Sequence, residues 1–179
     1  MEYLGLIVTI ILALVGYFFT YLNNLRLAKR ADRLKFVTTQ LDELYGPLYV
    51  ITQSGQILFQ ALNAKGLKKG RFIINQDAPD SAEDISDWRI WIEEVFQPLN
   101  EQLDHIIINK AHLIIEEEMP HCLKRFLAHS AGYKVVIKKW QMGDFTERSS
   151  VISFPVEIEE YAEKSYLMLK EQQKNLIGK

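Results

Sequence analysis

The pattern of hydrophobic positions begins with a long apolar run at the N-terminus. No charged side chain occurs between Tyr3 and Leu25, and residues 4 to 22 are almost all apolar. About 20 such residues in a helix cross the hydrocarbon layer of a membrane. A cleaved signal peptide would begin with basic residues and end at a small-x-small cleavage site, and the run has neither. The pattern therefore predicts a transmembrane helix over residues 1–25.

The charges beside this run predict its orientation. Glu2 is the only charged side chain before it, whereas basic residues gather directly after it. Because Lys and Arg favour the cytoplasmic side of a span, we expect the N-terminus outside and residues 26–179 in the cytoplasm. The residues expected to contact anionic lipid headgroups are Arg26, Lys29, Arg30, Arg33 and Lys35.

Small and hydroxyl-bearing residues form a stripe within the run. They are spaced three or four apart, which places them on one face of a helix. The stripe consists of Gly5, Thr9, Ala13, Gly16 and Thr20, and Asn24 continues it. Such a stripe can arise by chance on a lone anchor, or it can be a face on which helices pack closely in lipid. A ring of roughly six to eight copies would leave a lumen between helices about 10 Å wide.

The helical period continues after the apolar run. Residues 26–46 are expected to form a basic helical stalk, because no Pro or Gly interrupts the chain before Gly46 and Pro47. That pair is expected to bend or end the helix, since proline lacks a backbone donor. A heptad-like stripe runs along the stalk and favours ordinary helix core over a coiled coil. It consists of Leu34, Val37, Leu41, Leu44 and Leu48.

Residues 47–179 are expected to form a cytoplasmic helical domain. A helix over 47–63 should turn Leu48, Ile51, Ile57 and Leu58 inward, and Ser81–Asp84 resembles a capping box that opens a helix interrupted at Pro98. Further apolar helices are predicted over 99–118, 120–140 and 156–176, with a loop over 143–155. No strand pairing is evident. The predicted fold class is therefore all-α, a bundle of about five helices behind a single span.

Composition limits the classes of function. The chain has 179 residues, enough for one domain and an anchor, and its 21 Lys+Arg against 23 Asp+Glu argue against a nucleic-acid coat protein. A basic loop over 65–71 and a basic helix face at Lys134, Lys138 and Lys139 are expected to be solvated surface more often than RNA contacts. A single cysteine, Cys122, excludes an intrachain disulfide.

Metal and cofactor chemistry find little support in the sequence. All four histidines lie between His105 and His129, near the acidic run Glu116–Glu118. The Glu-x-x-His spacing of di-iron bundles occurs once, ending at His121, and Pro120 interrupts it. Neither a phosphate-binding glycine loop nor a serine nucleophile elbow is present. We therefore expect no metal and no cofactor.

One residue pair points to ribonuclease chemistry. Arg125 and His129 lie one helical turn apart and could jointly engage a phosphate. They resemble the Arg and His of HEPN ribonucleases, in which the pair promotes attack of the RNA 2′-hydroxyl on the adjacent phosphate. That family places four to six residues between the two, whereas three stand between them here. A phosphate-binding or protein-binding surface and a purely structural pair remain alternatives to cleavage.

The layout as a whole resembles a known group of proteins. An N-out span, a basic stalk and a helical domain with an imperfect Arg125/His129 pair resemble the small single-span accessory membrane proteins found beside RNA-targeting effectors of type VI-B CRISPR loci. The segment Leu41–Tyr49 also resembles uncharacterised bacterial single-span proteins. The first resemblance implies a HEPN-like cytoplasmic domain in the bacterial inner membrane. It also implies assembly into a homo-oligomeric pore and loss of membrane potential once the effector has recognised phage RNA.

These expectations lead to one main functional hypothesis and two alternatives. The main one is an oligomeric pore-forming accessory effector that strengthens CRISPR RNA-targeting defence, with membrane lipid and further copies of itself as partners. One alternative is a membrane-tethered HEPN-like ribonuclease that uses Arg125 and His129 on RNA. The other is a passive membrane scaffold that recruits a cytoplasmic partner through the helical domain.

Overall fold

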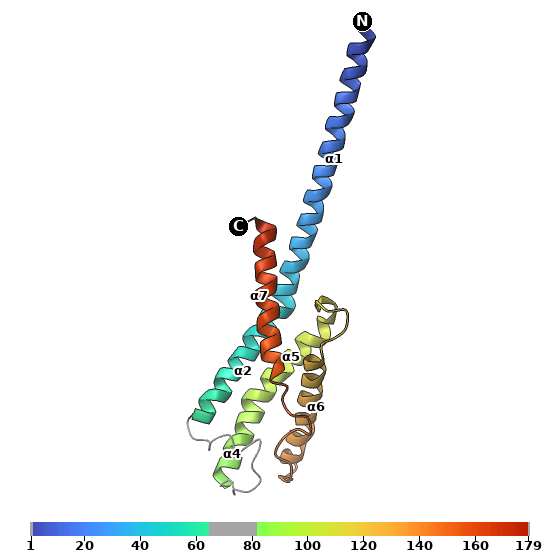
Figure 1. Cartoon of the computed structure of the whole chain (residues 1–179). Coiled ribbons are helices and arrows are strands. Elements are labelled where there is room, and N and C mark those ends of the chain that lie inside the picture. Colours follow the sequence, from blue (N-terminus) through green and yellow to red (C-terminus); the bar gives the residue numbers. More distant parts are fainter. Residues whose placement is uncertain (1, 65–81, 179) are drawn as a thin grey trace. The chain divides into compact units, whose positions relative to one another are not determined.

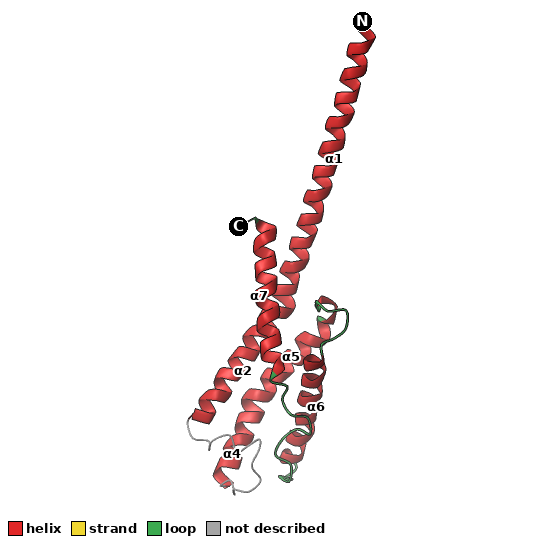
Figure 2. Ribbon diagram, in the orientation of Figure 1, coloured by secondary structure: helices red, strands yellow, loops and turns green. Residues whose placement is uncertain are grey.

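A computed structural model of the chain describes residues 2–64 and 82–178, and every regular element in this part is helical (Figure 2). The predicted all-α class is confirmed at this level, because the described residues form no strand. The elements are α1 (Glu2–Gln40), a π-helical turn η1 (Leu41–Tyr45), α2 (Gly46–Ala64), α4 (Ala82–Trp91), a π-helical turn η2 (Ile92–Phe96), α5 (Gln97–Asn109), a 3₁₀ turn η3 (Ala111–Leu113), α6 (His121–Gln141) and α7 (Glu157–Ile177).

The chain divides into two compact units. The first consists of residues 1–38 together with residues 171–179, and the second of residues 39–170. The boundaries predicted at residues 25 and 46 concern a membrane and a stalk, so they stay predictions. The basic loop predicted over 65–71 and Ser81 of the predicted capping box lie outside the described residues.

The first unit carries a long apolar helix. α1 belongs to one helix that is long and apolar enough to cross a membrane, and none of its most apolar stretch is buried. The basic residues that follow this stretch meet the C-terminal residues of the same unit. Arg30 Nε donates to the Leu176 carbonyl at 2.7 Å, and the Gln173 amide donates to the Thr38 hydroxyl at 3.1 Å.

The two prolines expected to interrupt helices do not break them. Each lies two residues after a π-helical turn, in which the residue before the proline donates to a carbonyl five residues back. Gly46 donates to Leu41 and Gln97 donates to Ile92 in this way. The wider turn accommodates Pro47 and Pro98 at the start of the next α-helix, where their missing donors cost little. The chain therefore stays helical through both positions. The predicted interruption at Pro98 is wrong, and of the two outcomes expected at Gly46–Pro47, a bend or an end, the end is wrong.

The second unit holds the hydrophobic core. α5 packs against both α2 and α6 and lies between them in Figure 1. The heptad-like stripe contributes buried side chains, and the remainder come from α5, α6 and α7. The largest fully buried side chains include Leu44, Tyr45, Leu48, Ile107, Leu123, Phe126, Ile158 and Leu169. A smaller cluster of Ile92, Tyr133, Val136 and Trp140 joins η2 to α6.

Two of the predicted helices need correction. Ile57, expected inward on α2, is 64% exposed, and Thr52 and Leu62 are buried instead. α5 ends at Asn109 rather than near Glu118, and a 3₁₀ turn and further turns lead to Pro120. The buried face of α2 therefore includes a polar residue, whose hydroxyl donates to the Leu48 carbonyl at 2.8 Å.

Candidate functional site

Arg125 and His129 lie one turn apart on α6 but have different surroundings. The Arg125 guanidinium is 3.8 Å from the Glu157 carboxylate and is partly exposed. His129 is buried, and its Nδ1 is 2.6 Å from the Ile152 carbonyl. Arg125 lines an open hollow together with Lys124 and His121, and His129 lines a separate cavity. The structure therefore does not bring the pair to one hollow.

The surroundings of His129 determine its protonation. A carbonyl oxygen can only accept, so Nδ1 carries the hydrogen and donates to Ile152, which leaves Nε2 with a free lone pair. Burial lowers the pKa of His129 and keeps the ring neutral. Tyr133 and Phe154 pack edge-on against the imidazole, with centroids 5.0 and 5.4 Å away. The imidazole is thus held as a neutral acceptor.

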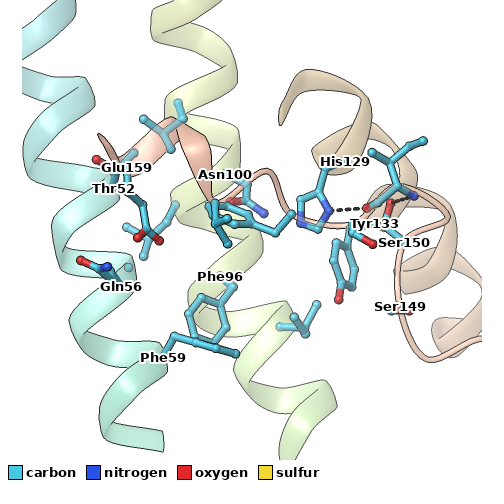
Figure 3. A pocket seen from close by; sticks show the side chains of 18 of the residues that line it. Thr52, Gln56, Phe59, Phe96, Asn100, His129, Tyr133, Ser149, Ser150 and Glu159 are labelled. Carbon is cyan, nitrogen blue, oxygen red and sulfur yellow. Dashed lines mark hydrogen bonds between the residues drawn. The ribbon is translucent and has the colours of Figure 1, made fainter. Parts of the chain in front are cut away.

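The cavity beside His129 is a deep hollow within the second unit. Its volume is about 320 Å³. Its lining residues belong to α2, α4, η2, α5, α6 and α7 and to the loop between α6 and α7 (Figure 3). Most of the lining is apolar. Its aromatic side chains are Phe59, Trp88, Phe96, Tyr133 and Phe154. Cavities of this size and composition are typical of small-molecule sites.

A few polar groups project into this apolar lining. Thr52 and Gln56 come from α2, Asn100 from α5 and Glu159 from α7 (Figure 3). Gln56 hydrogen-bonds the Glu159 carboxylate, while burial raises the pKa of Glu159. Among the described residues that line the cavity there is no lysine or arginine. The polar side of the cavity therefore carries one carboxylate without a cationic partner from its walls.

A glycine in mid-helix keeps one wall of the cavity open. Gly55 lies within α2 and lines the cavity, and a Cβ atom built on it would meet nothing within 4 Å. Glycine inside a helix costs about 1 kcal/mol relative to alanine. The packing of the described chain gives no reason for that cost. A longer side chain at this position would enter the cavity.

The predicted basic face of α6 is partly neutralised by carboxylates. Lys134 lies 3.8 Å from Asp104 and 3.9 Å from Glu101, and Lys139 pairs with Glu147. Burial raises the pKa of Asp104, and the Ser130 hydroxyl donates to it at 2.7 Å. These contacts favour a structural role for the lysines over binding of RNA phosphate.

Glu116 of the acidic run belongs to a hydrogen-bond network that holds a turn. The Ile115 amide donates to the Tyr45 hydroxyl, which lies 3.0 Å from the Tyr161 hydroxyl, and Tyr161 donates to Glu116. Burial raises the pKa of both tyrosines, so the network stays protonated. Within residues 2–64 and 82–178, no group of three His, Cys, Asp or Glu side chains is arranged to hold a metal ion.

The small-residue stripe of α1 is exposed along its length, and Asn24 is exposed as well. The hydroxyls of Thr9 and Thr20 donate to the carbonyls of Gly5 and Gly16, each at 2.9 Å. A Cβ atom on either glycine would meet nothing within 4 Å. The contacts found within the chain therefore do not account for the small size of these residues.

Comparisons with known proteins gave no relative from which this geometry could be interpreted. A scan against protein-family models, a search of curated proteins and a search of solved structures each gave no match. The resemblance to CRISPR accessory membrane proteins accordingly rests on layout and on the Arg125/His129 pair.

Sequence reasoning missed the cavity. Its polar groups belong to helices whose inward faces were defined by apolar residues alone. The apolar face of α2 is interrupted within five residues by Thr52, Gly55 and Gln56. On α7, Glu159 follows the buried Ile158. Such interruptions of an inward face are the signal that would have found the site.

Proposed function

We propose that this protein is a membrane-anchored, self-assembling pore protein that acts as an accessory effector in antiphage defence. The apolar part of α1 would cross the bacterial inner membrane with its N-terminus outside. The stripe of small residues would pack against neighbouring copies, and the helical domain would lie in the cytoplasm. The defence role comes from the resemblance to accessory proteins of type VI-B CRISPR loci.

The observation that carries the proposal is the pair of glycines on an exposed apolar helix. Gly5 and Gly16 lie eleven residues apart, close to three helical turns, so they share a face. Neither is approached by another side chain of the described chain. In lipid, small residues allow helix backbones to approach, and van der Waals packing drives their association. Another copy of α1 would use the space that the glycines leave.

The threonines of the stripe refine this picture. Their hydroxyls already donate to carbonyls one turn back, so neither requires a donor bond to a neighbour. Each oxygen keeps acceptor capacity that a neighbouring helix or water in a lumen could use. The stripe could therefore face lipid before assembly and water in a lumen afterwards.

The test is the mass of the purified full chain in lipid nanodiscs. We expect a closed assembly of six or more copies for the wild type, and a monomer or dimer when Thr9→Leu and Gly16→Leu are combined. A matched control, Ile11→Leu with Phe18→Leu, changes the other side of the helix and should assemble like the wild type. A monomeric wild type would overturn the pore. Membrane depolarisation, followed with a voltage-sensitive dye in cells, should disappear with assembly.

The scaffold hypothesis predicts a different outcome. Replacing residues 1–25 by an unrelated membrane anchor should abolish depolarisation and defence if the span forms a pore, whereas a scaffold would keep defence intact. The nuclease hypothesis receives little support from the geometry, because Arg125 pairs with Glu157 and His129 lies buried in a separate cavity. RNA cleavage by purified wild type that is lost in an Arg125→Ala, His129→Ala variant would revive it.

A further inference from the structure

We propose that the cavity of the helical domain binds a small organic ammonium ion with an aromatic or alkyl body. This inference does not depend on pore formation or on membrane insertion. It rests on the shape, lining and charge of one cavity within residues 39–170, and on a glycine that keeps it open.

The lining favours an apolar body. Five aromatic side chains, those of Phe59, Trp88, Phe96, Tyr133 and Phe154, contribute to the walls. Phe96 is the centre of this group, with ring centroids 6.3 Å from Phe59 and 6.1 Å from Trp88. Aromatic faces attract cations through their quadrupoles, and walls of this kind recognise ammonium ligands.

The polar groups favour a ligand that donates hydrogen bonds and carries positive charge. His129 is 94% buried, since 6% of its surface is exposed, and its Nε2 offers a lone pair with no partner among the described residues. Glu159 offers a carboxylate whose partner among these residues is the neutral Gln56 amide. Glu159 is half-buried, and a carboxylate partly shielded from water is stabilised by a counter-charge or by further donors. A protonated amine would supply that counter-charge to Glu159, while the lone pair of His129 could accept from an N–H group elsewhere on the ligand.

The same groups disfavour anions. No lysine or arginine appears among the described lining residues, so a phosphate or carboxylate would face Glu159 without compensation. With respect to the described lining, we therefore expect neither a nucleotide nor a fatty acid to be the preferred ligand. A neutral amphiphile would fill the apolar volume but leave the carboxylate unpaired, and it should bind more weakly than the matching cation.

An isosteric series tests the charge requirement. Tryptamine, tryptophol and indole-3-acetate share an indole ring and differ in carrying a cationic, a neutral and an anionic end. Isothermal titration of the detergent-solubilised full chain should show tryptamine binding at least about tenfold more tightly than tryptophol, and no saturable binding of indole-3-acetate. Glu159→Gln should remove the preference for tryptamine and leave tryptophol unchanged. The assignment of an ammonium ligand would be overturned if the wild type bound tryptamine and tryptophol with equal affinity. It would also be overturned if Glu159→Gln kept the full preference for tryptamine.

A second set of variants locates the binding. Gly55→Leu should fill the cavity and abolish tryptamine binding, because a side chain at this position enters open space. Ser54→Leu, at an exposed neighbouring position, should bind like the wild type. If circular dichroism shows that Gly55→Leu lowers helicity, Ser149→Trp serves as a second occluding variant from the loop. Binding that persists in a folded occluded variant, or no binding of tryptamine to the wild type, would refute the site.

Discussion

Leucine side chains in two regions of one helical run have opposite surroundings. Leu12 and Leu14 of the apolar run are 65% and 63% exposed, whereas Leu44 and Leu48 are fully buried. Around the first pair every face of the helix is apolar, so no face is distinguished as inward. Around the second pair the exposed Asp42 and Glu43 leave one apolar stripe to pack. Burial therefore follows the pattern of polar neighbours more than the hydrophobicity of the leucine itself.

The same substitution in both regions should give opposite phenotypes, and this is the largest effect we predict. Leu44→Arg places an unpaired charge in the core and should unfold the helical domain, measured by loss of cooperative thermal unfolding and by proteolysis. Leu12→Arg should leave that domain folded but weaken membrane insertion by about 2.5–3.5 kcal/mol, measured as the membrane-inserted fraction after carbonate extraction. A Leu12→Arg variant that unfolds the domain would contradict the contrast.

The glycines of the two regions offer a smaller, sharper contrast. A Cβ atom on Gly46 would lie 2.5 Å from the Leu41 carbonyl oxygen, the acceptor of the π-helical turn. Gly46→Ala must therefore shift backbone, and we expect a loss of about 1–3 kcal/mol in the free energy of unfolding. Gly16→Ala meets open space and should leave that free energy unchanged. Urea unfolding of both variants measures the difference, and equal stabilities would show that the π-helical turn absorbs a methyl group freely.

Lowering the pH should change the stability of the helical domain, whereas we expect no effect on the apolar run. The pKa of His129 lies below its ordinary value of 6.5, so the unfolded chain binds more protons just below that pH. The stabilisation is complete above pH 6.5 and is lost as the pH falls through the lowered pKa. In His129→Asn, which keeps a donor for the Ile152 carbonyl, Tm should depend less on pH in this interval.

The comparison between His129→Asn and the wild type isolates this effect. Burial raises the pKa of Asp104 and Glu159, so these carboxyls act on stability in the opposite sense. Both carboxyls are present in His129→Asn and in the wild type, so their effect cancels in the difference between the two Tm values. Identical slopes of Tm against pH would show that His129 makes no such contribution. Membrane association should stay constant over the same range, because the apolar run has no group that titrates there.

Much of the fold could be predicted from periodicity, and the errors lie where hydrophobic spacing does not report the backbone conformation. The starts of α2, α6 and α7 were placed within one or two residues by Pro or Gly and by a 3.6-residue period. The continuous helix at Pro47 and Pro98 could not be predicted, because a π-helical turn does not change the spacing of hydrophobic residues. The end of α5 was misjudged because the apolar pattern continues through Leu113 and Ile114, which lie in turns.

The candidate site was harder to predict than the fold. Arg125 and His129 share a helix, as expected, but spacing along a helix does not reveal what packs over each side chain. The Ile152 carbonyl that holds His129 and the Glu157 carboxylate beside Arg125 come from a loop and a later helix. The cavity is assembled from six helical elements and a loop, so no local pattern could define it.

The hydrogen bond from Arg30 to Leu176 determines when the first unit can be completed during translation. The two residues are 146 positions apart in the chain. Translation proceeds at about 5–20 residues per second, so on the order of ten seconds pass between synthesis of the donor and of the acceptor. The donor helix therefore exists for that interval without the residues that accept from it. The first unit is completed only once residues 171–179 have been made, and a chain truncated before them would lack this unit.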